Sequence, residues 1–100
     1  MALTNVSNEE RLQREQELIE RWIIPHCGKR GHAESVILNN GTSVWVIIYQ
    51  WLYDGNIERV KSSYELSEEA FDAAIAYYRQ HKHVIDARIT LEEDMWNDPR

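Results

Sequence analysis

The clearest hydrophobic pattern in the chain lies between residues 44 and 55. Apolar residues recur there at the i, i+3, i+4, i+7, i+8 spacing of a core-facing helix: Val44, Ile47, Ile48, Trp51 and Leu52. Gly55 follows them, and glycine commonly ends helices because it adopts the left-handed conformation without strain. The pattern predicts a helix over residues 44–54.

The N-terminal part of the chain carries a second helical stripe, formed by Leu12, Ile19, Trp22 and Ile23. Ser7 and Glu10 have the spacing of a capping box, and Pro25 stops the run. We therefore expect a helix over 8–23. Residues 1–6 show no helix-favouring pattern and are expected to fray.

Turn-forming residues dominate the next segment. Residues 25–32 combine a proline with two glycines, which predicts an exposed linker. Residues 35–38 favour β structure and precede the sequence Asn39-Asn40-Gly41, so they predict a short strand and a turn.

The second half of the chain again has helical spacing. Residues 57–64 predict a short unit with Ile57, Val60 and Tyr64 inward, and Ser67 is the expected N-cap of a helix over 68–82. The inner stripe of that helix is Phe71, Ala74, Ile75 and Tyr78. Thr90 and Glu93 predict the cap of a separate, brief acidic helix near the C-terminus.

These elements predict a mainly α fold with a trihelical helix-turn-helix core, an extra N-terminal helix and a short β segment. A chain of 100 residues has room for one hydrophobic core, so residues 1–100 are expected to form a single domain. Residues 89–100 form its acidic C-terminal segment.

The formal net charge of −6 is unevenly distributed. Five of the six excess negative charges fall in residues 65–100. Tight nonspecific binding to nucleic acid needs clustered Lys and Arg, and the sequence shows no such cluster. The charge pattern therefore weighs against DNA binding by the isolated chain.

The cysteine and hydropathy patterns bear on location. A single cysteine, Cys27, forms no internal disulfide, and the N-terminal stretch lacks a basic segment followed by a long apolar run. No apolar run approaches the ~20 residues that span a bilayer. We expect a cytoplasmic protein that is not inserted in a membrane.

Residues with catalytic or metal-binding potential have simpler interpretations. His26, Cys27 and His32 are metal-ligand types, with His81 or His83 as a further donor, but their spacing matches no zinc pattern. An exposed linker, with Cys27 as neither ligand nor nucleophile, is the preferred interpretation. The acidic residues of the third helix, Glu68, Glu69 and Asp72, suit its N-terminal dipole. We therefore predict no catalytic residue, no metal, no cofactor and no enzymatic activity.

Trp45, Tyr49 and Tyr53 form a second stripe on the helix over 44–54. A helix with two apolar faces is buried on two sides. The stripe packs either on the N-terminal helix, which we prefer, or on a second subunit in a homodimer.

Several segments together resemble a known family. They are Gly41-Thr42-Ser43-Val44-Trp45-Val46, Gly55, Tyr64-Glu65-Leu66-Ser67 and Ala73-Ala74-Ile75-Ala76-Tyr77-Tyr78. They resemble the family called domain of unknown function 433, over residues 36–88. The resemblance implies a homeodomain-like core and, because some members are antitoxins of toxin-antitoxin pairs, a binding module without catalysis.

Two functional hypotheses follow. The first is a non-catalytic, antitoxin-like module whose acidic end, with Asp86, Glu92, Glu93 and Asp94, binds a basic, toxin-like protein. The alternative is a dimeric DNA-binding transcriptional regulator that uses the third helix, with Arg79, Gln80 and Lys82 contacting DNA. The outward residues of that helix are expected to be Glu69, Asp72, Ala73, Ala76, Arg79 and Gln80.

Overall fold

The computed structural model describes residues 2–26, 31–38 and 40–97, and side chains within 8–96 of these ranges. The elements are α1 (Ala2–Trp22), β1 (Ile23–Ile24), η1, a 3-10 helix (Gly31–Glu34), β2 (Val36–Ile37), α2 (Val44–Asp54), α3 (Ile57–Ser63), α4 (Glu68–Gln80) and α5 (Lys82–Asn97). The mainly helical class with a short β segment is therefore confirmed.

The two strands form a small antiparallel sheet in which Ile23 pairs with Ile37 and Ile24 with Val36. The sequence predicts β2 but assigns Ile23 to the preceding helix. Two β-branched residues directly before a proline favour extended backbone, and β2 supplies their pairing partner. In the predicted linker, residues 27–30 lie outside the described ranges, and residues 31–32 begin η1.

Helix α1 begins at Ala2 rather than at residue 8, so the expected fraying of residues 1–6 is replaced by helix from residue 2 onward. Helix α2 has the predicted bounds, and Gly55 ends it with φ 75° while its N–H donates to the Trp51 carbonyl. Leu52, predicted inward, is 55% exposed, whereas Trp45 is buried. The buried face of α2 is turned toward Trp45 because α5 covers that side.

Helices α3 and α4 begin with side-chain caps. The Asn56 side chain accepts a hydrogen bond from the Arg59 N–H, and Ser67 Oγ accepts one from the Ala70 N–H, as predicted for Ser67. Val60 is buried and Tyr64 half-buried, but Ile57 is exposed, so its inward prediction is wrong. The short α3 turns only one face to the core.

The C-terminal third differs most from prediction. Helix α4 ends at Gln80 because His81 leaves helical conformation, with φ −125° and ψ 36°. A single helix α5 then runs from Lys82 to Asn97. The separate helix capped at Thr90 is wrong, because Ile85 and Ile89 keep helical spacing across that position and residues 82–97 contain no glycine or proline.

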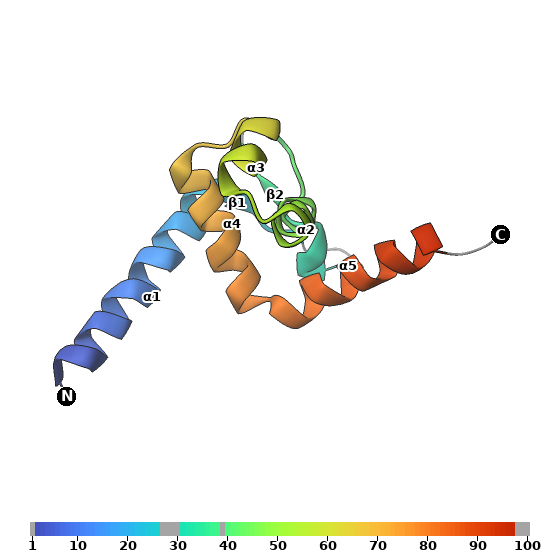
Figure 1. The fold of residues 1–100 in the computed structure, drawn as a ribbon. Helices are drawn as coiled ribbons and strands as arrows, with labels where there is room; N and C mark the ends of the chain where they lie inside the picture. Colours follow the sequence, from blue (N-terminus) through green and yellow to red (C-terminus); the bar gives the residue numbers. More distant parts are fainter. Residues whose placement is uncertain (1, 27–30, 39, 98–100) are drawn as a thin grey trace.

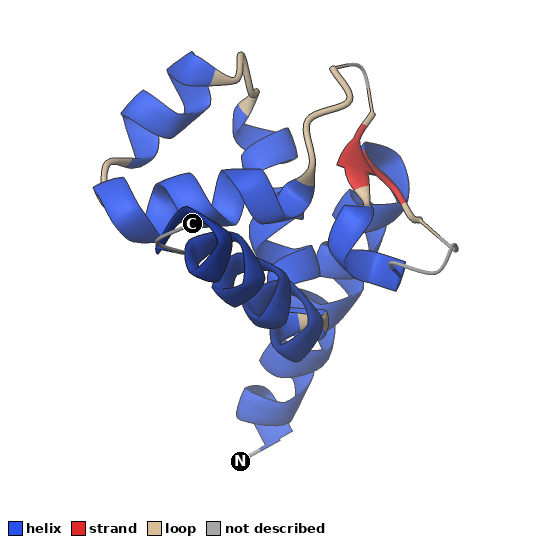
Figure 2. Ribbon diagram, turned by 90° about the vertical axis from the view of Figure 1, so that its right-hand side faces the viewer, coloured by secondary structure: helices blue, strands red, loops and turns tan. Residues whose placement is uncertain are grey.

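Helix α4 lies at the centre of the molecule. Helix α1 packs along it, α2 packs against both α4 and α5, and α5 also contacts η1. The backbone measures 56 by 27 by 26 Å. Its long dimension arises because the free ends of α1 and α5 point away from the body in opposite directions (Figure 1), and Figure 2 shows the small sheet at one side of the helices.

Candidate protein-docking surface

Helix α5 packs on the body with one face only. Ile85 is completely buried and Ile89 is nearly so, and both belong to the hydrophobic core. Successive residues of a helix are rotated by about 100°, so residues 85, 89 and 96 share this core-facing side. Trp96 nevertheless has 78% of its surface exposed, because the helix has by then extended past the body.

A second row of apolar side chains on α5 is uncovered. It consists of Val84, Ala87, Leu91 and Met95, which have helical i, i+3, i+7, i+11 spacing and are all exposed. We call this row the α5 stripe. Leu91 is 55% exposed and Met95 is 66% exposed. Contiguous exposed apolar residues on a small protein mark an interaction surface more often than chance.

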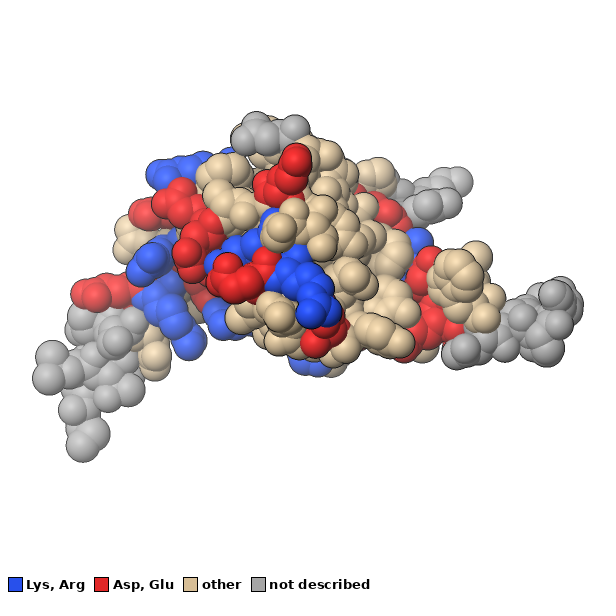
Figure 3. All heavy atoms as spheres, turned by 45° about the horizontal axis from the view of Figure 1, so that its top comes forward, with Lys and Arg blue, Asp and Glu red and all other residues tan. Residues whose placement is uncertain are grey.

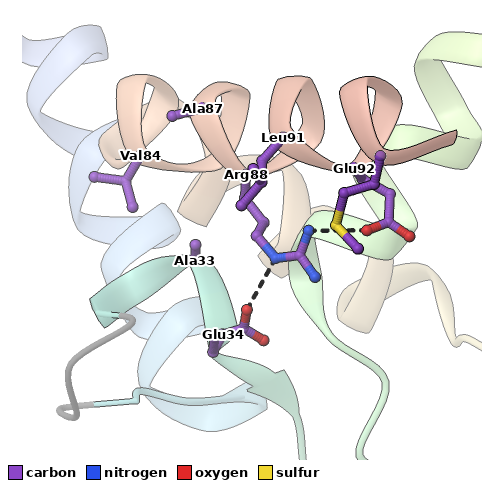
Figure 4. A pocket seen from close by; sticks show the side chains of 8 residues that line it. Ala33, Glu34, Val84, Ala87, Arg88, Leu91 and Glu92 are labelled. Atoms are coloured by element: carbon purple, nitrogen blue, oxygen red, sulfur yellow. Dashed lines mark hydrogen bonds and ion pairs between the residues drawn. The ribbon is translucent and has the colours of Figure 1, made fainter. Parts of the chain in front are cut away.

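A groove of about 560 Å³ runs between the α5 stripe and η1. Its wall on η1 is formed by Ala33 and Glu34, and its wall on α5 includes Arg88 and Glu92 in addition to the stripe (Figure 4). The stripe is therefore bordered by a hollow large enough to hold bulky side chains.

Arg88 fixes α5 to the body at this groove. Its Nε donates to Glu34 Oε1 at 3.0 Å and its Nη1 to Glu92 Oε2 at 3.1 Å. The guanidinium carbon lies 4.1 Å from the centre of the Trp45 ring, a cation–π contact. Burial acts to lower the pKa of Arg88, but the two carboxylates outweigh it and the net shift is upward.

The predicted acidic interface residues fall into two groups. Asp86 accepts hydrogen bonds from the Tyr78 hydroxyl at 2.6 Å and from Lys82 Nζ at 2.7 Å, and Glu92 is held by Arg88. Burial acts to raise the pKa of Asp86, but these two donors outweigh it and lower the pKa. Glu93 and Asp94, by contrast, are exposed. We call Glu93, Asp94, Met95 and Trp96 the acidic tip.

The aromatic row of α2 packs within the chain, but on a different helix from the predicted one. Trp45 is buried beneath Arg88 of α5, whereas α1 packs along α4. Tyr49 stacks on Trp45 and is half-buried, and Tyr53 is 81% exposed. The prediction that the row contacts the N-terminal helix is therefore wrong, because Arg88 of α5 covers Trp45 while α1 packs on α4 instead.

Helix α1 covers the face of α4 that we expected to point outward. Ala73 and Ala76 are buried rather than exposed. They share a helix face with Glu69, which accepts hydrogen bonds from Arg21 and Trp22 of α1 at 3.4 Å, and with Gln80, which donates to Gln16 at 3.5 Å. Small side chains let the two helices approach closely, which is the reason the prediction failed.

The predicted DNA contacts have partners within the chain. Arg79 pairs with Glu15 of α1, Gln80 contacts Gln16, and Lys82 pairs with Asp86. On the face shown in Figure 3, basic and acidic side chains are interspersed and the basic ones form no continuous field. The positive charges of Arg79 and Lys82 are thus largely neutralised by neighbouring carboxylates.

Two histidines that are far apart in sequence meet beside α4. The sequence pattern groups them only as possible metal ligands. The rings of His32 and His81 stack with centroids 4.1 Å apart, and His32 Nδ1 lies 2.7 Å from the Tyr77 hydroxyl. That hydroxyl lies 2.8 Å from Ser35 Oγ. Burial, and then the neighbouring His32, lower the pKa of His81.

The remaining chemical candidates have structural roles or lie outside the described residues. Cys27 is among the latter. Within residues 2–26, 31–38 and 40–97, no three His, Cys, Asp or Glu side chains come together as a metal site. Glu68 pairs with Lys61, and Glu69 pairs with Arg21.

Comparisons with protein families, curated proteins and solved structures found no match to this chain. None of the described helices combines the length and the hydrophobicity needed to cross a bilayer.

Proposed function

We propose that this protein is a non-catalytic module that binds another protein through the acidic tip of α5. The observation that carries the proposal is the exposed Trp96, which has 78% of its surface free at the end of a helix that has left the body. Tryptophan is the residue type most enriched at the energetic centres of protein interfaces. Exposing it to water without a partner has no structural benefit to the fold.

The chemistry of the tip specifies the partner. Glu93 and Asp94 precede Met95 and Trp96, so large apolar side chains lie beside carboxylates. The complementary surface is an apolar pocket rimmed by Lys or Arg, and the opposite charges accelerate and orient association. We therefore propose a small basic protein, such as a toxin, as the partner.

The test is capture of partners by the tagged protein from its native lysate, after nuclease treatment, compared with a Trp96→Ala variant. We expect a stoichiometric basic protein with wild type and at least about tenfold less of it with the variant. Tyr53→Ala is the matched control, because Tyr53 is a similarly exposed aromatic residue, on α2. Equal capture by wild type and Trp96→Ala would refute the proposal.

The DNA-binding alternative has less support. The face of α4 that would enter a groove is covered by α1, and Arg79 and Lys82 pair with carboxylates. Repeating the capture without nuclease treatment addresses it: enrichment of one promoter region that is lost after nuclease treatment would favour the regulator.

A further inference from the structure

We infer that the α5 stripe is a self-association surface on which a second copy of this chain docks, with the two α5 helices antiparallel. The stripe shares Met95 with the acidic tip, but Trp96, which carries the proposed function, lies on another side of the helix. The inference rests on the stripe and its edges rather than on Trp96.

The sizes of the side chains along the stripe are complementary to themselves. When two copies of α5 run antiparallel about a twofold axis between residues 89 and 90, Ala87 faces Leu91 of the second copy and Val84 lies near its Met95. Each small residue is thereby opposite a large one, which lets helices pack at the usual separation of about 8–10 Å. A parallel pair would place Leu91 on Leu91 and Ala87 on Ala87, leaving one layer crowded and the next one empty.

The polar side chains beside the stripe favour the same arrangement. His83 and Asp94 lie along the edge away from η1 and both are exposed. A perpendicular twofold axis brings like edges of two antiparallel helices together, so His83 of each copy meets Asp94 of the other. A parallel pair would instead bring opposite edges together and place Asp94 close to Glu92 of the second copy, which is repulsive.

The groove provides room for the second copy. Its volume of about 560 Å³ lies directly beside the stripe, between α5 and Ala33 of η1. Arg88 and Glu92 lie on the edge of the stripe nearer to η1 and have opposite charges. The same antiparallel axis therefore places Arg88 near Glu92 of the second copy. The Arg88–Glu92 edge is thus complementary in charge, and at the other edge the His83 imidazole is placed to donate a hydrogen bond to Asp94.

The first test is the molar mass of the purified protein by light scattering at about 100 µM, a concentration that populates a micromolar dimer. We expect a dimer for the wild type and a dissociation constant raised at least about tenfold by Leu91→Asp. Leu52→Asp is the matched control, because Leu52 on α2 is as exposed as Leu91, at 55%, but lies outside the stripe. A wild-type monomer, or equal weakening by both variants, would overturn the inference.

Disulfide trapping tests the direction of the helices. In a Cys27→Ser background, a mixture of Ala87→Cys and Leu91→Cys proteins should form a mixed disulfide-linked dimer, because these positions face each other. Ala87→Cys alone should not cross-link, since its two copies are separated along the axis by about five residues, or ~7.5 Å. Cross-linking of Ala87→Cys alone at the rate of the mixture indicates a parallel pair and overturns the arrangement.

The two proposals fail separately. Loss of the dimer with partner capture retained removes only the self-association surface. Loss of capture by the dimeric wild type removes only the role of the acidic tip.

Discussion

Helices α1 and α5 both lie partly on the body and partly beyond it, but they differ in how far their apolar rows are covered. Where α1 crosses α4, its apolar residues Leu18, Ile19 and Trp22 pack inward. Ion pairs close the border of that contact, including Glu15 with Arg79 and Arg21 with Glu69. On α5, large apolar side chains continue on two sides after the body has ended.

The difference separates a completed contact from an incomplete one. The α1–α4 contact has buried small residues at its centre and paired charges at its edge, as at the interface of two stable domains. The α5 stripe and the acidic tip have the apolar centre and the charged edge but lack the opposing surface. Charged groups of α5 are also paired within the chain, so it is the uncovered apolar side chains that distinguish α5 and lead us to propose it as the docking element.

The largest expected effect comes from the covered side of α5. Ile85→Ala removes a fully buried side chain and should lower the free energy of unfolding by about 2–5 kcal/mol. Leu91→Ala, on the uncovered side, should change it by less than about 0.5 kcal/mol. Urea unfolding of both variants at concentrations where they are monomeric measures the difference, and equal losses would mean that the stripe is packed in the monomer.

A smaller decrease in the free energy of unfolding is expected from overpacking where α1 crosses α4. Ala76→Leu inserts three carbon atoms into a face on which Ala76 is 1% exposed, and overpacking of this kind costs about 1–3 kcal/mol. Gln13→Leu on the exposed side of α1 is the control for the added apolar surface. If Ala76→Leu unfolds at the same urea concentration as the control, close packing of α1 on α4 is disproved.

The smallest effect concerns the histidine pair between η1 and the end of α4. Because the folded state holds the pKa of His81 below its ordinary value of 6.5, the unfolded chain binds more protons as the pH falls. The contribution of neutral His81 to stability is therefore present above pH 6.5 and is lost on acidification below it. The urea concentration at the midpoint of unfolding should decrease as the pH is lowered from about 7.5 to 5.5, and it should decrease less in His81→Gln. If the midpoint of His81→Gln changes with pH as much as that of the wild type, His81 does not cause the pH dependence.

Local sequence signals predicted the elements that depend on neighbouring residues. The Ser67 cap, the Gly55 stop and the bounds of α2 are confirmed, because a side-chain cap or a left-handed glycine acts within a few residues. The short strand predicted at 35–38 is confirmed over 36–37, where it pairs with Ile23 and Ile24. The candidate surface was predicted only in part: Glu93 and Asp94 are exposed, but Met95 and Trp96 were not singled out.

What the sequence alone determined is therefore the helical class, most helix ends and the acidic character of the C-terminal part. Tertiary structure decided which helix covers which face. Helix α1 covers Ala73 and Ala76, which were expected to face solvent or DNA, and α5 covers Trp45, which was expected to contact the N-terminal helix. It also brought His32 to His81 and left Trp96, near the end of α5, exposed. Hydrophobic periodicity shows that a face is apolar, but the residues that cover it lie far away in the chain, and their position follows from packing the whole domain.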